Sequence, residues 1–411
     1  MKKLHTLILA PVAMAVLLST ASWAAEQPAL SDRAYRAVNK AQALITEKKY
    51  GEANAKLQEA LSGVGERVYD KGVILQTLGF VAAQQEKYGQ ATKYFADAIA
   101  TGGLPQPVAQ QVRYNLAQLY MAEGDFKASI STMNQWFASL GKDEKPTPHA
   151  YITLANAHVQ LKQYREAIPA VDTAIKLSAG KAPESWYLLK MAAHYELKQY
   201  KPATEVLTAL VDRYPEKKKY WTQLSAMQMQ AGNDGKALAA LESAYHLGML
   251  TEPAELQRLA NYLAFSGIPH RAARVMEKAM KDGVIEGNAA NYKALANYWH
   301  QAKELDPAID TLAKSYQLAP NAELQLKMAR MMIQSKRYQD LVALAAKPAA
   351  NANGEQRADL KFLTGVAYFE QQKPKEALSA FTQAAQNSNV SGRASPWINF
   401  LKEQQGGAIT Q

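Results

Sequence analysis

Two histidines occupy matching places in a repeated stretch of this sequence. The segment 157–164 returns 36 residues later as 193–200, and the two copies place His158 and His194 at equivalent positions. Neutral imidazole is a common metal ligand, and its pKa also suits it to sensing pH. No Asp or Glu at helical spacing completes a metal-ligand set, so the sequence favours partly buried imidazoles that fill a gap between helices.

Other catalytic constellations are missing from the sequence. The chain has no cysteine, which excludes disulfides, iron–sulfur clusters and thiol nucleophiles. It has no H-E-x-x-H motif, no P-loop, no G-x-S-x-G elbow and no dinucleotide fingerprint. The seven histidines are scattered along the chain. We therefore expect no enzymatic activity, no catalytic residues, no cofactor and no metal site.

Small or apolar residues recur at a period that indicates structural repeats. One set runs from Ala53 to Ala377, and its ten members lie 33 to 38 residues apart. A second small residue lies twelve positions before nearly every member, with Met191 as the exception. Large apolar residues accompany both sets at helical spacing. This pattern predicts paired antiparallel helices, which need small residues where their backbones approach most closely.

These repeats resemble tetratricopeptide (TPR) repeats. The segments Tyr114-Asn-Leu-Ala-Gln-Leu-Tyr120 and Gly124-Asp-Phe126 carry the pattern, and the resemblance covers roughly residues 31–390. It implies an all-α solenoid of about ten TPR-like helix-turn-helix repeats. Residues 348–354 depart from the pattern, and there we expect a longer connection or a truncated second helix.

The end of the array is expected to be covered. Stacked repeats leave an apolar face at each terminus, which a capping helix hides from water. We expect this helix at 394–405, with Trp397 and Phe400 sealing the last repeat, and a flexible tail at 406–411.

Residues 1–24 are expected to be a cleaved signal peptide. A basic start precedes an apolar run from Leu7 to Leu18, which is too short to span a bilayer, and Ser22-Trp23-Ala24 supplies small residues at the cleavage positions. A mature start at Ala25 implies a periplasmic protein without stable membrane insertion. The net charge of +10 falls to +8 when Lys2 and Lys3 are removed. Because this charge is mild and no aromatic-basic patch accompanies it, nucleic acid is not an expected partner.

In a TPR array the first helix of each repeat lines the concave face, and this resemblance points to a protein-binding groove. The residues one, four and five places after the first small position are expected to face it. Most are amides, aliphatics or aromatics. From them we select ten candidate groove residues: Phe80, Gln118, Asn156, Gln160, Tyr195, Gln230, Asn261, Phe265, Asn297 and Gln301.

Such a groove suits an extended peptide. Amides both donate and accept hydrogen bonds, so they can pair with a peptide backbone, while aromatic neighbours add apolar contact area. Lysine and arginine are largely missing from these positions, so the basic clamp of some cytosolic TPR proteins is not matched and salt is expected to change affinity little. The alternative is that these polar residues simply face water.

A second resemblance concerns the pathway. The segments 183–200, 215–225, 256–286 and 396–401 are similar to a family of periplasmic TPR proteins that accompany TonB–ExbB–ExbD systems. That resemblance implies an envelope adaptor that helps iron-chelate uptake, with TonB-system components among its partners. The alternative is an adaptor for cell-envelope polysaccharide or peptidoglycan machinery, which would carry a basic stripe along one face. The order of the sequence shows no such stripe.

Overall fold

The computed structural model describes residues 29–407. The expected signal peptide at 1–24 and the last four residues of the expected tail lie outside this range. Within it the chain forms 21 helices and no strand, so the predicted all-α class is confirmed. No helix of the described part is long and apolar enough to span a membrane.

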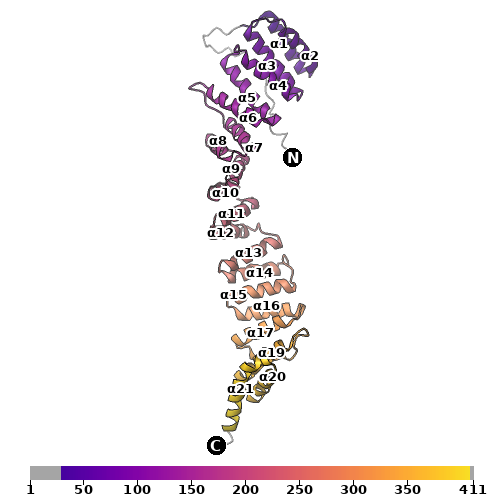
Figure 1. Ribbon diagram of the computed structural model, residues 1–411, viewed down its shortest axis with the longest axis vertical. Coiled ribbons are helices and arrows are strands. Elements are labelled where there is room, and N and C mark those ends of the chain that lie inside the picture. The colour runs from indigo at the N-terminus through magenta and orange to yellow at the C-terminus, as the bar shows by residue number, and fades with distance from the viewer. Residues whose placement is uncertain (1–28, 408–411) are drawn as a thin grey trace. The chain divides into compact units, whose positions relative to one another are not determined.

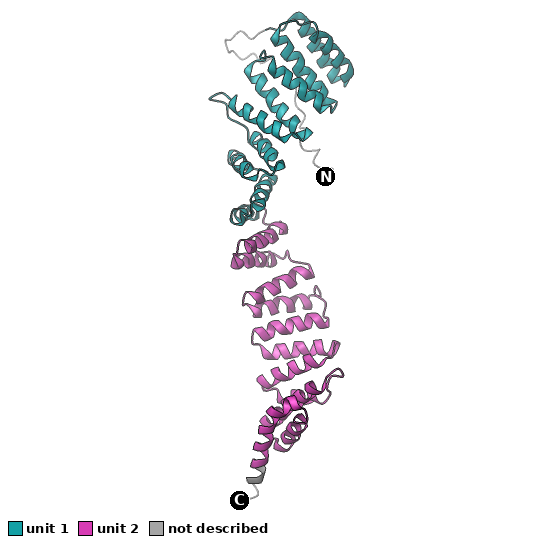
Figure 2. Cartoon of the chain, viewed as in Figure 1, with its two compact units in different colours: residues 1–213 teal, residues 214–411 magenta. Residues whose placement is uncertain are grey.

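The helices divide between two compact units, residues 1–213 and 214–411 (Figures 1 and 2). In both units, neighbouring helices pair along the chain. The first unit contains five pairs: α1 (Asp32–Thr46) with α2 (Tyr50–Leu61), α3 (Val68–Gln84) with α4 (Tyr88–Ala100), α5 (Gln106–Glu123) with α6 (Phe126–Ala138), α7 (Pro148–Gln160) with α8 (Tyr164–Leu177), and α9 (Glu184–Glu196) with α10 (Tyr200–Arg213).

The second unit contains five further pairs and a final helix. The pairs are α11 (Lys218–Gln230) with α12 (Asp234–His246), α13 (Pro253–Phe265) with α14 (Pro269–Lys281), α15 (Ala289–Gln301) with α16 (Leu305–Leu318), α17 (Ala322–Gln334) with α18 (Tyr338–Ala345), and α19 (Gly354–Glu370) with α20 (Pro374–Ala384); the final helix is α21 (Ser388–Gly407). The ten pairs match the ten predicted repeats.

The small residues lie where paired helices touch. A Cβ added to Gly79 on α3 would come within 2.6 Å of the Phe95 ring on α4, and one added to Gly365 on α19 would come within 2.7 Å of Phe381 on α20. Both phenylalanines are buried, so each large ring fills the space that a small residue leaves. The spacing of small and large residues therefore predicted the contact between paired helices correctly.

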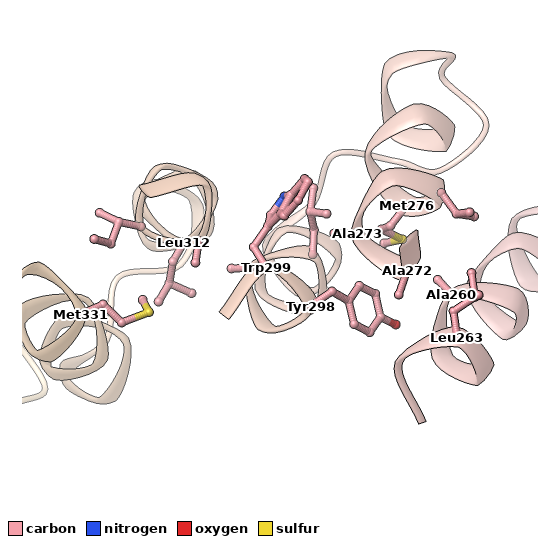
Figure 3. Packing of buried hydrophobic residues seen from close by; sticks show 14 of the residues in the cluster. Ala260, Leu263, Ala272, Ala273, Met276, Tyr298, Trp299, Leu312 and Met331 are labelled. Atoms are coloured by element: carbon pink, nitrogen blue, oxygen red, sulfur yellow. The ribbon is translucent and has the colours of Figure 1, made fainter. Parts of the chain in front are cut away.

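The second unit shows how this packing continues from one pair to the next. Its largest cluster of buried side chains extends across α12 to α19, and Figure 3 shows part of it. Ala260 on α13, Ala272 and Met276 on α14, and Tyr298 on α15 belong to this cluster. Burial of such side chains supplies the main favourable free energy of each repeat, because the hydrophobic effect scales with apolar area removed from water.

A left-handed residue ends the first helix of every pair. It lies five positions before the small residue of the second helix, and its φ is between +56° and +82°: Lys48, Glu86, Gly124, Lys162, Lys198, Gly232, Gly267, Lys303, Lys336 and Gln372. In the α7–α8 hairpin, the Gln163 amide donates to the His158 carbonyl and the Lys162 amide donates to Val159. These are the two hydrogen bonds of a Schellman motif. Seven of the ten residues are not glycine, so glycine marks this turn in only three of the hairpins.

The irregular segment around residue 350 has a defined structure. Helix α18 has only eight residues, which confirms the expected truncated second helix. The buried amide of Gln325 on α17 holds the segment that follows. Its Nε2 donates to the carbonyls of Leu344 and Lys347, and its Oε1 accepts from the Ala349 amide.

The C-terminal helix is longer than the expected 394–405, since α21 begins at Ser388 and includes Gly406 and Gly407 of the expected tail. The Trp397 ring stacks on buried Phe381 with centroids 5.3 Å apart. Phe400 meets the Phe369 ring of α19 with centroids 6.1 Å apart but stays 44% exposed, so it covers the last repeat only in part. Leu401, one residue further along the helix, is fully buried instead.

Candidate functional site

The first helices of successive pairs together form one side of each unit, which we call the first-helix face. In the first unit this face carries five of the candidate groove residues. Phe80 lies on α3, Gln118 on α5, Asn156 and Gln160 on α7, and Tyr195 on α9. Gln160 and Tyr195 are exposed, whereas Gln118 and Asn156 are partly buried. Phe80 points partly into the core, because its ring meets buried Phe95 edge-on at 5.1 Å. Tyr195, half exposed, is therefore the aromatic candidate most open to a partner on this unit.

The corresponding face of the second unit carries the other five candidates. Gln230 lies on α11, Asn261 and Phe265 on α13, and Asn297 and Gln301 on α15. Phe265 is 82% exposed, which is unusual for a phenylalanine in a folded protein. Met229, near the end of the preceding first helix α11, is also about half exposed. This face thus offers apolar area to water beside a row of amides.

Side-chain hydrogen bonds join successive first helices of the second unit. The Tyr298 phenol on α15 donates to Asn261 Oδ1 on α13 at 2.6 Å, and Lys327 on α17 donates to Asn297 Oδ1 on α15. Burial raises the pKa of Tyr298, which keeps the phenol protonated and able to donate. Each of these two asparagines thus already uses one acceptor position of its carbonyl oxygen within the protein, while its N–H groups remain to donate.

Two lysines also reach this face beside Arg330, which the sequence pattern already placed there, so the face carries more positive charge than expected. Lys327 bonds Asn297 directly, Lys293 on α15 lies 3.9 Å from Glu323, and Arg330 on α17 lies 3.6 Å from Asp359. Burial lowers the pKa of the Lys327 ammonium, nearby Lys293 lowers it further, and Glu323 opposes them.

Two of these three cations, both lysines, lie outside the three positions per first helix from which the groove residues were predicted. Lys293 and Lys327 lie three and two places before the first small residue, whereas we took groove residues one, four and five places after it. Because a helix turns about 100° per residue, positions about one turn earlier share the same face. The full helical face, including the preceding turn, would have revealed both lysines.

The matching histidines are part of the turn between paired helices. His158 Nδ1 and Gln163 Oε1 are 2.8 Å apart, and His194 Nδ1 and Gln199 Oε1 are also 2.8 Å apart. In each case the histidine and glutamine lie at the two positions of the Schellman motif whose side chains normally touch. The next repeat has Gln228 and Asn233 at the two corresponding positions, where Asn233 Nδ2 donates to Gln228 Oε1. This geometry supports the structural interpretation of both histidines.

No group of three or more acidic or histidine side chains in the described part of the chain is arranged to hold a metal ion. A hollow with a volume of about 720 Å³ lies between α12 and α14. Four cations of α14 line it at helical spacing: Arg271, Arg274, Lys278 and Lys281. Three of them pair with carboxylates, namely with Glu242, Glu277 and Asp282 respectively.

Comparison with known proteins supports the repeat family. Residues 77–139 and 148–180 match two family descriptions that both read tetratricopeptide repeat. These segments correspond to α4, α5 and α6 with the end of α3, and to the α7–α8 pair. No curated protein matches the chain in sequence. Tetratricopeptide repeats generally mediate protein–protein interaction, so protein binding is the class of function that these matches support.

Solved structures of helical repeat proteins resemble the chain at low identity. A tetratricopeptide repeat protein from Parabacteroides merdae is 13% identical, with 74% of this chain and 100% of that chain covered and a TM-score of 0.38. The protein MamA is 15% identical, with 43% of this chain and 91% of that chain covered and a TM-score of 0.36. The C-terminal part of a TPR repeat-containing protein from Cytophaga hutchinsonii is 14% identical, with 69% of this chain and 99% of that chain covered and a TM-score of 0.33. Such scores support no statement about ligand or partner.

Proposed function

We propose that this protein is a non-catalytic scaffold that binds other proteins through the first-helix faces of its repeats. The observation that carries the proposal is the exposure of Phe265, 82% of whose surface is open to water on α13. Keeping a phenylalanine in water forgoes roughly 1.5–3 kcal/mol of burial free energy. Large aromatic side chains are also the common anchors of protein interfaces.

The test is capture of partners from a periplasmic extract, with bound proteins identified by mass spectrometry. We compare the wild type with a Phe265→Ser variant and with a Leu318→Ser control, because Leu318 is also an exposed apolar side chain of the second unit, at the end of α16. Loss of the same partner from Phe265→Ser alone supports the proposal. Equal recovery by all three proteins would place the binding surface elsewhere.

The finer proposal is a periplasmic accessory of TonB-dependent energy transduction and iron-chelate uptake. Its support is the sequence resemblance in segments 183–200, 215–225, 256–286 and 396–401. TonB-system proteins among the captured partners are the expected result, and a partner set without them argues against this pathway. Intact mass of protein recovered from the periplasm tests the location, and a mass that begins at Ala25 is expected.

The second candidate is an adaptor for anionic cell-envelope glycans. The cations of α14 that line the hollow between α12 and α14 form the basic stripe that this alternative requires. Because the Arg274–Glu277 and Lys278–Asp282 pairs are exposed, each contributes little and an anionic ligand can compete for their cations. Binding of polygalacturonate that is lost in an Arg274→Gln/Lys281→Gln variant would favour this candidate over the first.

A further inference from the structure

The first-helix face of α13, α15 and α17 differs chemically from one end to the other. At one end lies exposed Phe265, and the preceding first helix carries the half-exposed Met229. At the other end lie the cations Lys293, Lys327 and Arg330. A ligand that covers this face therefore meets apolar area first and positive charge about two repeats later.

Asn297 has two hydrogen-bond donors to offer such a ligand. A lysine ammonium has donors and no acceptor, so the bond between Lys327 and Asn297 must use the asparagine carbonyl oxygen. That bond fixes the orientation of the amide and leaves its two N–H groups for a partner. A group that satisfies them must be an acceptor, such as a backbone carbonyl or a carboxylate.

The positive charge beside Asn297 is only partly neutralised. No carboxylate of the described residues lies within 4 Å of Lys327 Nζ, and the carboxylate of Glu323 lies 3.9 Å from Lys293. Arg330 lies 3.6 Å from Asp359, whose carboxylate also binds Arg393. The three cations of this face thus have only two carboxylates near them, Glu323 and Asp359, and Asp359 also binds Arg393. An incoming carboxylate would gain charge-assisted hydrogen bonds from Lys327.

The spacing sets the length of the ligand. Neighbouring helices pack about 8–10 Å apart, so Phe265 and Lys327 are separated by roughly 20 Å across two repeats. An extended chain rises about 3.3 Å per residue and covers that distance in about six residues.

We propose that this face of the second unit binds an extended acidic segment of a protein partner, with an apolar side chain on Phe265 and a carboxylate about six residues away on Lys327 and the Asn297 amide. The proposal deepens the protein-binding function and rests on it. It assigns the partner a chemistry, namely an internal acidic residue at a fixed distance from a large apolar one.

The experiment uses the full mature chain and defined fluorescent peptides. The probe is a capped 13-residue peptide of alanine and serine with a central phenylalanine and a glutamate six residues to either side. A twin peptide carries glutamine in place of both glutamates. A third peptide lacks the glutamates but ends in a free C-terminal carboxylate six residues after phenylalanine. Polygalacturonate represents a glycan polyanion. Fluorescence anisotropy measures the dissociation constants of the peptides, and competition measures polygalacturonate.

We expect the glutamate peptide to bind about tenfold more tightly than its glutamine twin, since one charge-assisted hydrogen bond is worth at least that factor. Lys327→Met, which keeps the alkyl stem, and Asn297→Asp, which adds a negative charge, should each remove this preference. Lys281→Gln on α14 changes the net charge equally as Lys327→Met does and should leave the preference intact. Circular dichroism checks that all variants remain folded.

Several outcomes would overturn the proposal. Equal binding of the glutamate and glutamine peptides, or the same preference in Lys327→Met as in the wild type, would show that no carboxylate is recognised here. Tighter binding of the free-carboxylate peptide would assign the site to a chain terminus instead. Competition by polygalacturonate that Lys281→Gln abolishes would assign it to glycan on the other face. Partner capture that needs Phe265 but not Lys327 would retain the protein-binding function while rejecting the acidic subsite.

Discussion

At the scale of single residues, the turn between paired helices carries a recurrent local strain. Seven of its ten left-handed residues carry a side chain, although glycine adopts this conformation at no steric cost. An L-residue in this region loses roughly 1–2 kcal/mol through contact between its Cβ and the following carbonyl oxygen. Both Schellman hydrogen bonds form in all seven of these hairpins and compensate for part of that cost.

Replacing Lys162 by glycine is therefore expected to stabilise the α7–α8 hairpin. Lys162 has φ +57°, and removal of its Cβ relieves the strain, while the added chain entropy of glycine offsets part of the gain. The expected net gain in unfolding free energy is about 0.5–1 kcal/mol. Lys176→Gly, in the last turn of α8, is the control and should cost about 1 kcal/mol. Denaturant melts of both variants give the comparison, and destabilisation by Lys162→Gly would contradict the strain argument.

At the scale of helices, the second unit departs from its regular repeat where α18 shortens. The connection that follows α18 lies on the buried amide of Gln325, which replaces the backbone bonds that a longer helix would have made. A buried backbone group left without a partner costs roughly 1–3 kcal/mol, so one side chain controls this segment.

Gln325→Ala should destabilise the second unit by about 2–3 kcal/mol. Hydrogen exchange should accelerate first in α18 and in residues 346–353, because those backbone groups lose their partners. Gln334→Ala is a matched control on the same helix, since Gln334 is exposed, and should change stability by less than about 0.5 kcal/mol. Unchanged exchange in 338–353 would show that the amide does not hold this segment.

The C-terminal helix gives a second prediction at this scale. Leu401→Ala removes a fully buried side chain and should cost about 2–5 kcal/mol, whereas Phe400→Ala removes a ring that is about half exposed and should cost much less. The loss should appear first as faster hydrogen exchange in α19 and α20, against which α21 packs. Equal effects of the two changes would mean that Phe400 also closes the last repeat.

At the scale of the whole molecule, each hairpin contacts mainly its neighbours along the chain. Stability in such an array is approximately a sum of repeat and nearest-neighbour terms, so damage should remain local. When stability depends mainly on nearest-neighbour contacts, a binding face on one unit can stay folded while another unit opens.

Leu57→Ala tests this locality in the first unit. Leu57 is fully buried beneath α1 and α3, and its loss should cost about 2–5 kcal/mol. Hydrogen exchange should accelerate in α1 to α4 and remain unchanged in α13 to α17. Equal acceleration in both units would show that the chain unfolds as one cooperative body.

The hydrophobic periodicity of the sequence is sufficient to predict most of the architecture. A helix pair buries its side chains locally, so small residues at fixed intervals, such as Gly79 opposite Phe95, identify each contact from the sequence. Local packing of this kind needs no long-range information. The number of repeats, the short α18 and the existence of a final helix were predictable for this reason.

The chemistry of the candidate site was decided by tertiary structure. The orientation of the Asn297 amide depends on Lys327, which is 30 positions away in sequence and bonds it only because two first helices lie side by side. Likewise, the sequence could not distinguish Phe265, which is left in water, from Phe80, which meets a buried ring. Periodicity assigns a residue to a helix face, but its exposure and its free hydrogen-bonding groups depend on the neighbouring helix.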